Sequence, residues 1–145
     1  MKKPTPADLF SRPPLLIVRV TPRGLRILPT EETIEALEGH VISHGPRRKL
    51  FLEGILACHS DDAVTAKDSK RCQDCLHPLC RPQIRLRLAT REAHYVLDLA
   101  VTSAKNLLAL EEDLRAQGLR LMDVRLRLTV TARGHYGEVA FERLP

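Results

Sequence analysis

Aromatic side chains are scarce in this 145-residue sequence, which contains two tyrosines, three phenylalanines and no tryptophan. Long apolar runs are also missing. The run near the start, Leu15–Val18, is far shorter than the roughly 20 residues that a membrane helix needs. The opening residues, Met1–Pro6, are followed by no apolar segment of signal-peptide length. We therefore expect neither a membrane protein nor an exported one, and we place the protein in the cytoplasm.

Motifs that carry enzyme chemistry are absent as well. The sequence contains no G-x-S-x-G, no H-E-x-x-H, no phosphate-binding G-x-x-x-x-G-K-[ST] and no deaminase signature. We therefore expect a protein that is not an enzyme. A metal-dependent nuclease that uses Glu53, Asp98 or Glu138 remains an alternative, although acidic residues in or near strands more often pair with arginine.

The charge is positive. Lysine and arginine number 23 against 18 aspartates and glutamates, for a formal net charge of +5 and an isoelectric point near 9.3, and arginine dominates. An arginine-rich composition fits either a genome of high G+C content or a protein that binds phosphates, for which the planar guanidinium is well suited. Only clustering of the charge favours nucleic acid.

The length fits one domain with a sizeable core. Proline and small polar residues in 1–14 predict a flexible arm, and residues 15–145 are expected to form a single domain. Ile84, Leu86 and Leu88 alternate with polar residues, which is typical of a half-buried strand. Similar patterns predict the following strands: 15–20, 25–28, 50–58, 83–89, 94–99, 124–131 and a last strand at 139–141.

Two helices are predicted. Thr30 followed by Glu31 and Glu32 looks like a capped helix start, and an apolar stripe of Ile34, Leu37 and Val41 predicts a short helix of about two turns, with Gly39 as its stop. A stronger pattern predicts a long helix over 102–117, with Gly118 as its stop. The fold class is therefore mainly β with one long helix (α+β), in a curled, mostly antiparallel sheet.

All four cysteines, Cys58, Cys72, Cys75 and Cys80, follow the spacing C-x13-C-x2-C-x4-C. Two disulfides, a redox pair and free thiols are alternatives, but the spacing favours one structural Zn²⁺ per chain, held in a zinc loop over 58–80. Four thiolates leave no open position for a water, so the ion would stabilise the loop rather than catalyse. The spacing does not decide whether His59 or His77 replaces a cysteine.

The strands carry rows of arginine. Arg85, Arg87, Arg125 and Arg127 occupy the positions that alternate with buried leucines, so we expect them on outward sheet faces. If those strands share a face, the four guanidinium groups form a track for a phosphate backbone. The complete set of predicted nucleic-acid-binding residues is Arg47, Arg48, Lys49, Arg85, Arg87, Tyr95, Arg125, Arg127 and Tyr136.

The order of strands, a helix between residues 102 and 117 and a closing hairpin, with a zinc loop between strands, resembles the zinc-containing OB-fold. Among such proteins it is most similar to the single-stranded-DNA-binding proteins of the phage type. Residues 95–141 carry the resemblance, and 58–80 would be the zinc insertion. The resemblance implies an OB-like antiparallel barrel that binds single-stranded nucleic acid. The chain differs from many phage proteins in having few rings and in ending without an acidic tail.

The leading hypothesis is therefore non-enzymatic binding of single-stranded nucleic acid, with DNA favoured, through the arginine-bearing sheet face. The alternative is a protein–protein adaptor in which zinc stiffens a docking loop within a larger, nucleic-acid-processing complex.

Overall fold

The computed structural model describes residues 13–52, 55–60 and 80–145. Most of the predicted arm and the greater part of the predicted zinc loop lie outside these residues. The described chain is mostly β, with one long helix. Its elements, in chain order, are β1 (Leu15–Thr21), β2 (Gly24–Leu28), β3 (Glu32–Ile34), β4 (Ala36–Leu52), β5 (Ile55–Ser60), β6 (Cys80–Ala89), β7 (His94–Leu99), α2 (Val101–Ala116), the 3₁₀ turn η2 (Leu121–Asp123), β8 (Arg125–Arg133) and β9 (Tyr136–Arg143).

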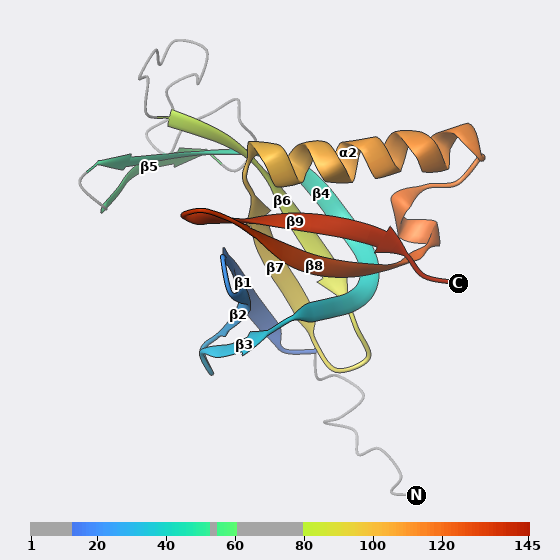
Figure 1. Ribbon diagram of the computed structural model, residues 1–145, viewed down its shortest axis with the longest axis horizontal. Helices are drawn as coiled ribbons and strands as arrows, with labels where there is room; N and C mark the ends of the chain where they lie inside the picture. The colour runs from blue at the N-terminus through green and yellow to red at the C-terminus, as the bar shows by residue number, and fades with distance from the viewer. Residues whose placement is uncertain (1–12, 53–54, 61–79) are drawn as a thin grey trace, which may run out of the picture.

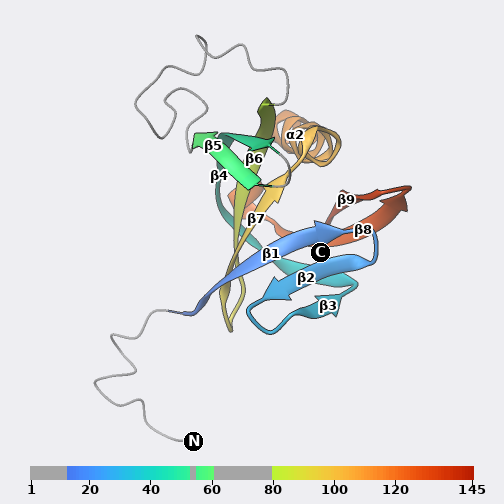
Figure 2. The same cartoon turned by 90° about the vertical axis from the view of Figure 1, so that its left-hand side faces the viewer.

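The strands form one sheet in the order β3-β2-β1-β7-β6-β4-β8-β9, with β5 paired to β4 outside this path. The pairings are antiparallel except for β1 with β7, which run parallel from Leu15 opposite His94 to Val18 opposite Leu97. The sheet curls strongly into a half-barrel, which confirms the expected mainly-β class with a curled sheet (Figures 1 and 2). β5 and the adjoining ends of β4 and β6 project beyond it.

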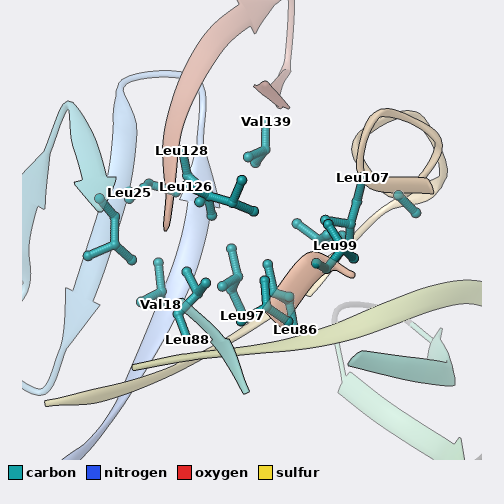
Figure 3. Close-up of a cluster of buried hydrophobic side chains, with 14 of the residues drawn as sticks. Val18, Leu25, Leu86, Leu88, Leu97, Leu99, Leu107, Leu126, Leu128 and Val139 are labelled. Carbon is teal, nitrogen blue, oxygen red and sulfur yellow. The ribbon is translucent and has the colours of Figure 1, made fainter. Parts of the chain in front are cut away.

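Alternating leucines build the core. Leu86 and Leu88 on β6 and Leu126 and Leu128 on β8 are fully buried, as the alternation with arginine predicts. Side chains from β1, β2, β7 and β9 complete the same cluster, and Leu107 projects into it from α2 towards Leu99 (Figure 3). Because one sheet face holds the core, the residues between the leucines lie on the other face.

Helix α2 covers the edge of β9. The Ser103 hydroxyl accepts a hydrogen bond from the Val139 backbone N–H at 2.8 Å, and the Asn106 amide donates to the Val139 carbonyl at 2.9 Å. The helix ends at the predicted stop. Gly118 adopts a φ of 76°, and the Gly118 and Leu119 N–H groups close the last turn on Arg115 and Leu114. Within the described residues, no helix has the length and apolarity required to cross a lipid bilayer.

The short helix predicted to begin at Thr30 and stop at Gly39 is wrong, because β3 and the start of β4 occupy this segment. Leu37, Gly39 and Val41 all face inward with the strand period of two, and the glycine hides this alternation in the sequence. A Cβ at Gly39 would lie only 2.7 Å from the Ala89 carbonyl oxygen. Pairing of β4 with both β8 and β6 outweighs the local helix signals.

The prediction of a single strand over 50–58 is also wrong. This segment holds the end of β4 and the start of β5, which pair antiparallel with a register shift between Leu50 and Phe51. The hairpin brings Cys58 back alongside β4.

The curl of the sheet brings the β1–β2 hairpin into contact with β8 and β9. The closest approach is at Gly137 on β9, where an added Cβ would overlap the Thr21 carbonyl oxygen and crowd the Val130 side chain. Absence of a side chain at Gly137 therefore lets β1 and β9 come together. Gly45, in the middle of β4, has open space where its Cβ would be.

We predict that Gly137→Ala lowers the free energy of unfolding by about 1–3 kcal/mol, because the new methyl group forces β9 away from β1. The matched control, Gly45→Ala, should leave stability unchanged or raise it by up to about 1 kcal/mol, because alanine loses less entropy than glycine in a strand. Urea denaturation followed by circular dichroism measures both. Equal effects of the two substitutions would refute this account of how the sheet closes.

Candidate nucleic-acid interface

A groove opens where β1 separates from β7. The two strands pair only as far as Val18 opposite Leu97, and beyond this point β1 bends towards β9 while β7 continues beside β6. The groove between them has a volume of about 760 Å³. We call it the cationic groove. The charged residues and the exposed large apolar residues that line it are Leu15, Ile17, Arg19, Lys49, Arg85, Arg87, Asp98 and Tyr136.

Asp98 is the carboxylate around which the groove cations gather. Arg85 donates to both of its oxygens, at 2.9 Å from Nε and 3.2 Å from Nη2, and Lys49 donates to Oδ2. Arg47 on β4 is buried and places Nη1 3.9 Å from the same Oδ2. The Asp98 side chain is only 14% exposed. One carboxylate thus orders three cations and leaves an excess of positive charge.

Two further arginines line the groove without a carboxylate partner among the described residues. Arg19 follows Ile17 on the outer side of β1, and Arg87 lies next to Arg85 on the outer side of β6. Both are exposed. Their guanidinium groups therefore have hydrogen-bond donors available for a ligand, and the chemistry that matches them is a phosphate or carboxylate.

The wall of the groove across from β6 is mainly apolar, although it also carries Arg19. Leu15 and Ile17 on β1 are 59% and 54% exposed, and Tyr136, at the start of β9, is 53% exposed. Sequence reasoning named Tyr136 but missed Leu15, Ile17 and Arg19. The available signal was the alternation within β1, which puts these three residues on the face opposite buried Val18.

Arg125 and Arg127 lie outside the cationic groove, at Glu38 on β4. Arg125 donates to this carboxylate at 2.9 Å, and Arg127 donates through both Nε and Nη2, at 2.9 and 2.7 Å. The hydrogen bond from Arg127 lowers the pKa of Glu38, and the nearby positive charges add to the effect. Both arginines are therefore partly neutralised. Tyr95 is half-buried and packs against the core.

The four predicted arginines do share one face of the sheet. Arg87 lies opposite Ser43 on β4, and Arg125 lies opposite His40 on the same strand, which places both on the side away from the core. A register shift between Val41 and Ser43 interrupts β4 between these two positions. This irregularity and the curl of the sheet divide the arginines into a pair inside the groove and a pair around Glu38.

Of the remaining predicted positions on β4, two approach Asp98 and the third, Arg48, lies between them in the sequence. Arg47 and Lys49 both approach Asp98. Arg48 is placed between them at the register position of Ser60 on β5 and Pro82 on β6.

Cys58 and Cys80 occupy corresponding positions on β5 and β6, because each lies opposite Leu50 on the strand between them. Residues paired with the same position lie on one face of a sheet. Both thiols are half-buried and neither forms a disulfide bond. Cys72, Cys75 and His77 lie outside the described residues, and His59 lies opposite Lys49.

The acidic residues of the nuclease alternative are held in ion pairs where the structure describes them. Asp98 binds Lys49 and Arg85, and Glu138 accepts hydrogen bonds from Arg133 at 2.8 Å and from Asn106 at 3.3 Å. The bond from Arg133 lowers the pKa of Glu138. Over residues 13–52, 55–60 and 80–145, no three His, Cys, Asp or Glu side chains form a potential metal site. Glu53 is outside these ranges.

We predict that Asp98→Asn lowers the free energy of unfolding by about 1–3 kcal/mol at neutral pH, because buried charged hydrogen bonds lose their anionic partner. Glu38→Gln removes the same charge from an arginine pair at the surface and should cost less. Urea denaturation of both variants gives the comparison. A loss for Glu38→Gln as large as that for Asp98→Asn would show that Asp98 has no special structural role.

Comparisons with protein families, curated proteins and solved structures give no match for this chain. The groove is therefore the feature that bears on function: Lys49, Arg85 and Arg87 lie across from exposed Leu15, Ile17 and Tyr136, and Arg19 adds a fourth cation on β1.

Proposed function

We propose that this protein binds single-stranded nucleic acid, preferentially DNA, through the cationic groove and without catalysing a reaction. The observation that carries the proposal is the excess of charge in the groove, where four cationic side chains accompany one carboxylate, Asp98. Phosphates supply most of the affinity in sequence-independent binding, and a groove of this kind follows a flexible backbone. The exposed ring of Tyr136 adds a surface against which a base can stack.

The OB-like character of the fold is part of the same proposal. A strongly curled sheet with α2 between β7 and β8 supports it. Arg125, Arg127 and Tyr95 keep their predicted role only as an extension of the path beyond the groove, because their own site is centred on Glu38.

We also propose that Cys58, Cys72, Cys75 and Cys80 hold one structural Zn²⁺, with His59 and His77 as alternative ligands. The shared register position of Cys58 and Cys80 supports this, because both ends of the predicted loop then lie opposite the same residue of β4 and on one face of the sheet. Such an ion would couple metal binding to folding of residues 58–80. A reducing compartment such as the cytoplasm, where we propose that the protein acts, keeps cysteines as free thiols that can bind a metal ion.

A protein–protein adaptor is the second candidate function. It is favoured by the projection of β5 and the adjoining ends of β4 and β6 beyond the curled sheet (Figure 1), a shape suited to docking. In that case the zinc loop would contact the partner, and the groove cations would pair with an acidic surface on it.

The test of nucleic-acid binding is titration of a fluorescent single-stranded DNA at increasing salt. Four cations less one carboxylate leave three net charges, so log K should fall with log[salt] with a slope of roughly −2. Arg19→Glu combined with Arg87→Glu should weaken binding at least about tenfold and flatten this dependence, because the variant loses the two groove arginines that make no ion pair with described residues.

The matched control is Arg23→Glu combined with Lys105→Glu. These exposed cations lie in a turn and on α2, outside both the groove and the site around Glu38, so the net charge changes equally without altering either. The control should bind nearly as tightly as the native chain. Equal losses in both variants would reduce the interaction to net charge. No binding by the native protein at low salt would refute the function and leave the adaptor.

Elemental analysis of protein purified without chelators tests the metal site, and we expect about one zinc per chain. Cys58→Ser or Cys80→Ser should abolish stoichiometric zinc, whereas His59→Ala and His77→Ala reveal whether a histidine is a ligand. Less than about a third of an equivalent in the native protein would contradict a closed four-ligand site.

A further inference from the structure

The apolar wall of the cationic groove favours a ligand that carries apolar groups as well as negative charge. Leu15 and Ile17 are the most exposed large aliphatic side chains in the described chain, and they occupy successive outward positions on one strand. Tyr136 on β9 lines the same groove. The other exposed large apolar residues, Ile42, Val101, Leu108 and Met122, do not line it. The three most exposed large apolar side chains of the described residues therefore all line the groove.

The register places this wall across from the arginines of β6, whereas Arg19 lies beside Ile17 on β1 itself. Ile17 lies opposite Val96 on β7, and Val96 lies opposite Arg87 on β6. Two strand spacings, or about 10 Å, therefore separate the backbone of the apolar wall from that of the arginine row. Buried Val96 lies between the two walls. A ligand bound across the groove meets only positive charge on the β6 side, and on the β1 side it meets hydrocarbon and a phenol ring next to a single arginine, Arg19.

A single nucleic-acid strand has this two-sided chemistry. Its phosphates lie along one side, and its unpaired bases present flat, weakly polar faces on the other. A duplex encloses its base faces between neighbouring pairs and presents only backbone and groove edges. An inorganic polyphosphate has no apolar part at all. The apolar wall can therefore contribute to binding only when bases are unpaired.

We infer that Leu15, Ile17 and Tyr136 contact unpaired bases while Arg19, Lys49, Arg85 and Arg87 hold the phosphates. This inference rests on the proposed nucleic-acid function and assigns selectivity for single strands to the apolar wall. Two of the three wall residues are aliphatic, so their contact is hydrophobic and does not distinguish one base from another. The cations determine the salt dependence, and the wall determines the preference for bases.

The experiment compares three fluorescent ligands with equal numbers of phosphates: an oligothymidine, an abasic strand of the same length and a DNA duplex. The native protein should bind oligothymidine about tenfold more tightly than the abasic strand, which corresponds to the lower range of base-contact energies. It should also prefer oligothymidine to the duplex. Leu15→Ser combined with Ile17→Ser should reduce the preference over the abasic strand to less than about threefold, with an unchanged salt slope.

The matched control is Val101→Ser combined with Met122→Ser, which removes two exposed apolar side chains outside the groove and should retain the preference. Circular dichroism confirms folding, and Tyr136→Ser provides a second wall variant. Equal affinity of the native protein for oligothymidine and the abasic strand would overturn the inference while leaving polyanion binding intact. Absence of binding to all three ligands would overturn the proposed function together with it. Binding of a poly-glutamate peptide as tight as that of oligothymidine would instead indicate an acidic protein partner.

Discussion

The packing of one leucine-rich sheet face around a single core determines where the charged side chains of this protein lie. Leu86, Leu88 and Leu97 are buried on β6 and β7, so the residues between them must occupy the outer face. Arg85, Arg87 and Asp98 come together there because β6 and β7 are neighbours in register. The same alternation that stabilises the fold therefore produces the charged surface, without any separate loop or insertion.

Asp98 connects this surface to the stability of the sheet. It binds side chains from β4 and β6 while itself belonging to β7, so it links three adjacent strands on the side away from the core. A carboxylate is needed because Arg47 and Lys49 are largely buried, and buried cations require a charged or hydrogen-bonded partner. Glu38 plays a similar role for Arg125 and Arg127, although it is more exposed. These two arginines are therefore engaged in ion pairs, whereas Arg19 and Arg87 in the groove have no carboxylate partner among the described residues.

Part of the site follows from local pattern and part does not. Alternation along β6 and β8 predicted that Arg85, Arg87, Arg125 and Arg127 face outward, and their register confirms it. Alternation carries no information about the irregularity at Val41 and Ser43, which divides the row into two groups. Arg19 and Ile17 were not predicted as site residues, because the sequence of a strand does not show which strand it pairs with or where it bends. The zinc prediction still depends on the cysteine spacing. The pairing of Cys58 and Cys80 with the same residue of β4 is compatible with it.

Local patterns in the amino-acid sequence are enough to predict the mainly-β class, the span and stop of α2, and the outward position of the arginines, because periods of 2 and 3.6 residues and the conformation of Gly118 are local properties. The strand at residues 36–41 depends instead on long-range pairing, since a glycine hides the alternation and pairing with β6 and β8 outweighs the capping signals. The parallel pairing of β1 with β7, and the groove where these strands separate, likewise depend on the folded chain. Contacts between residues about eighty positions apart have no signature in either strand alone.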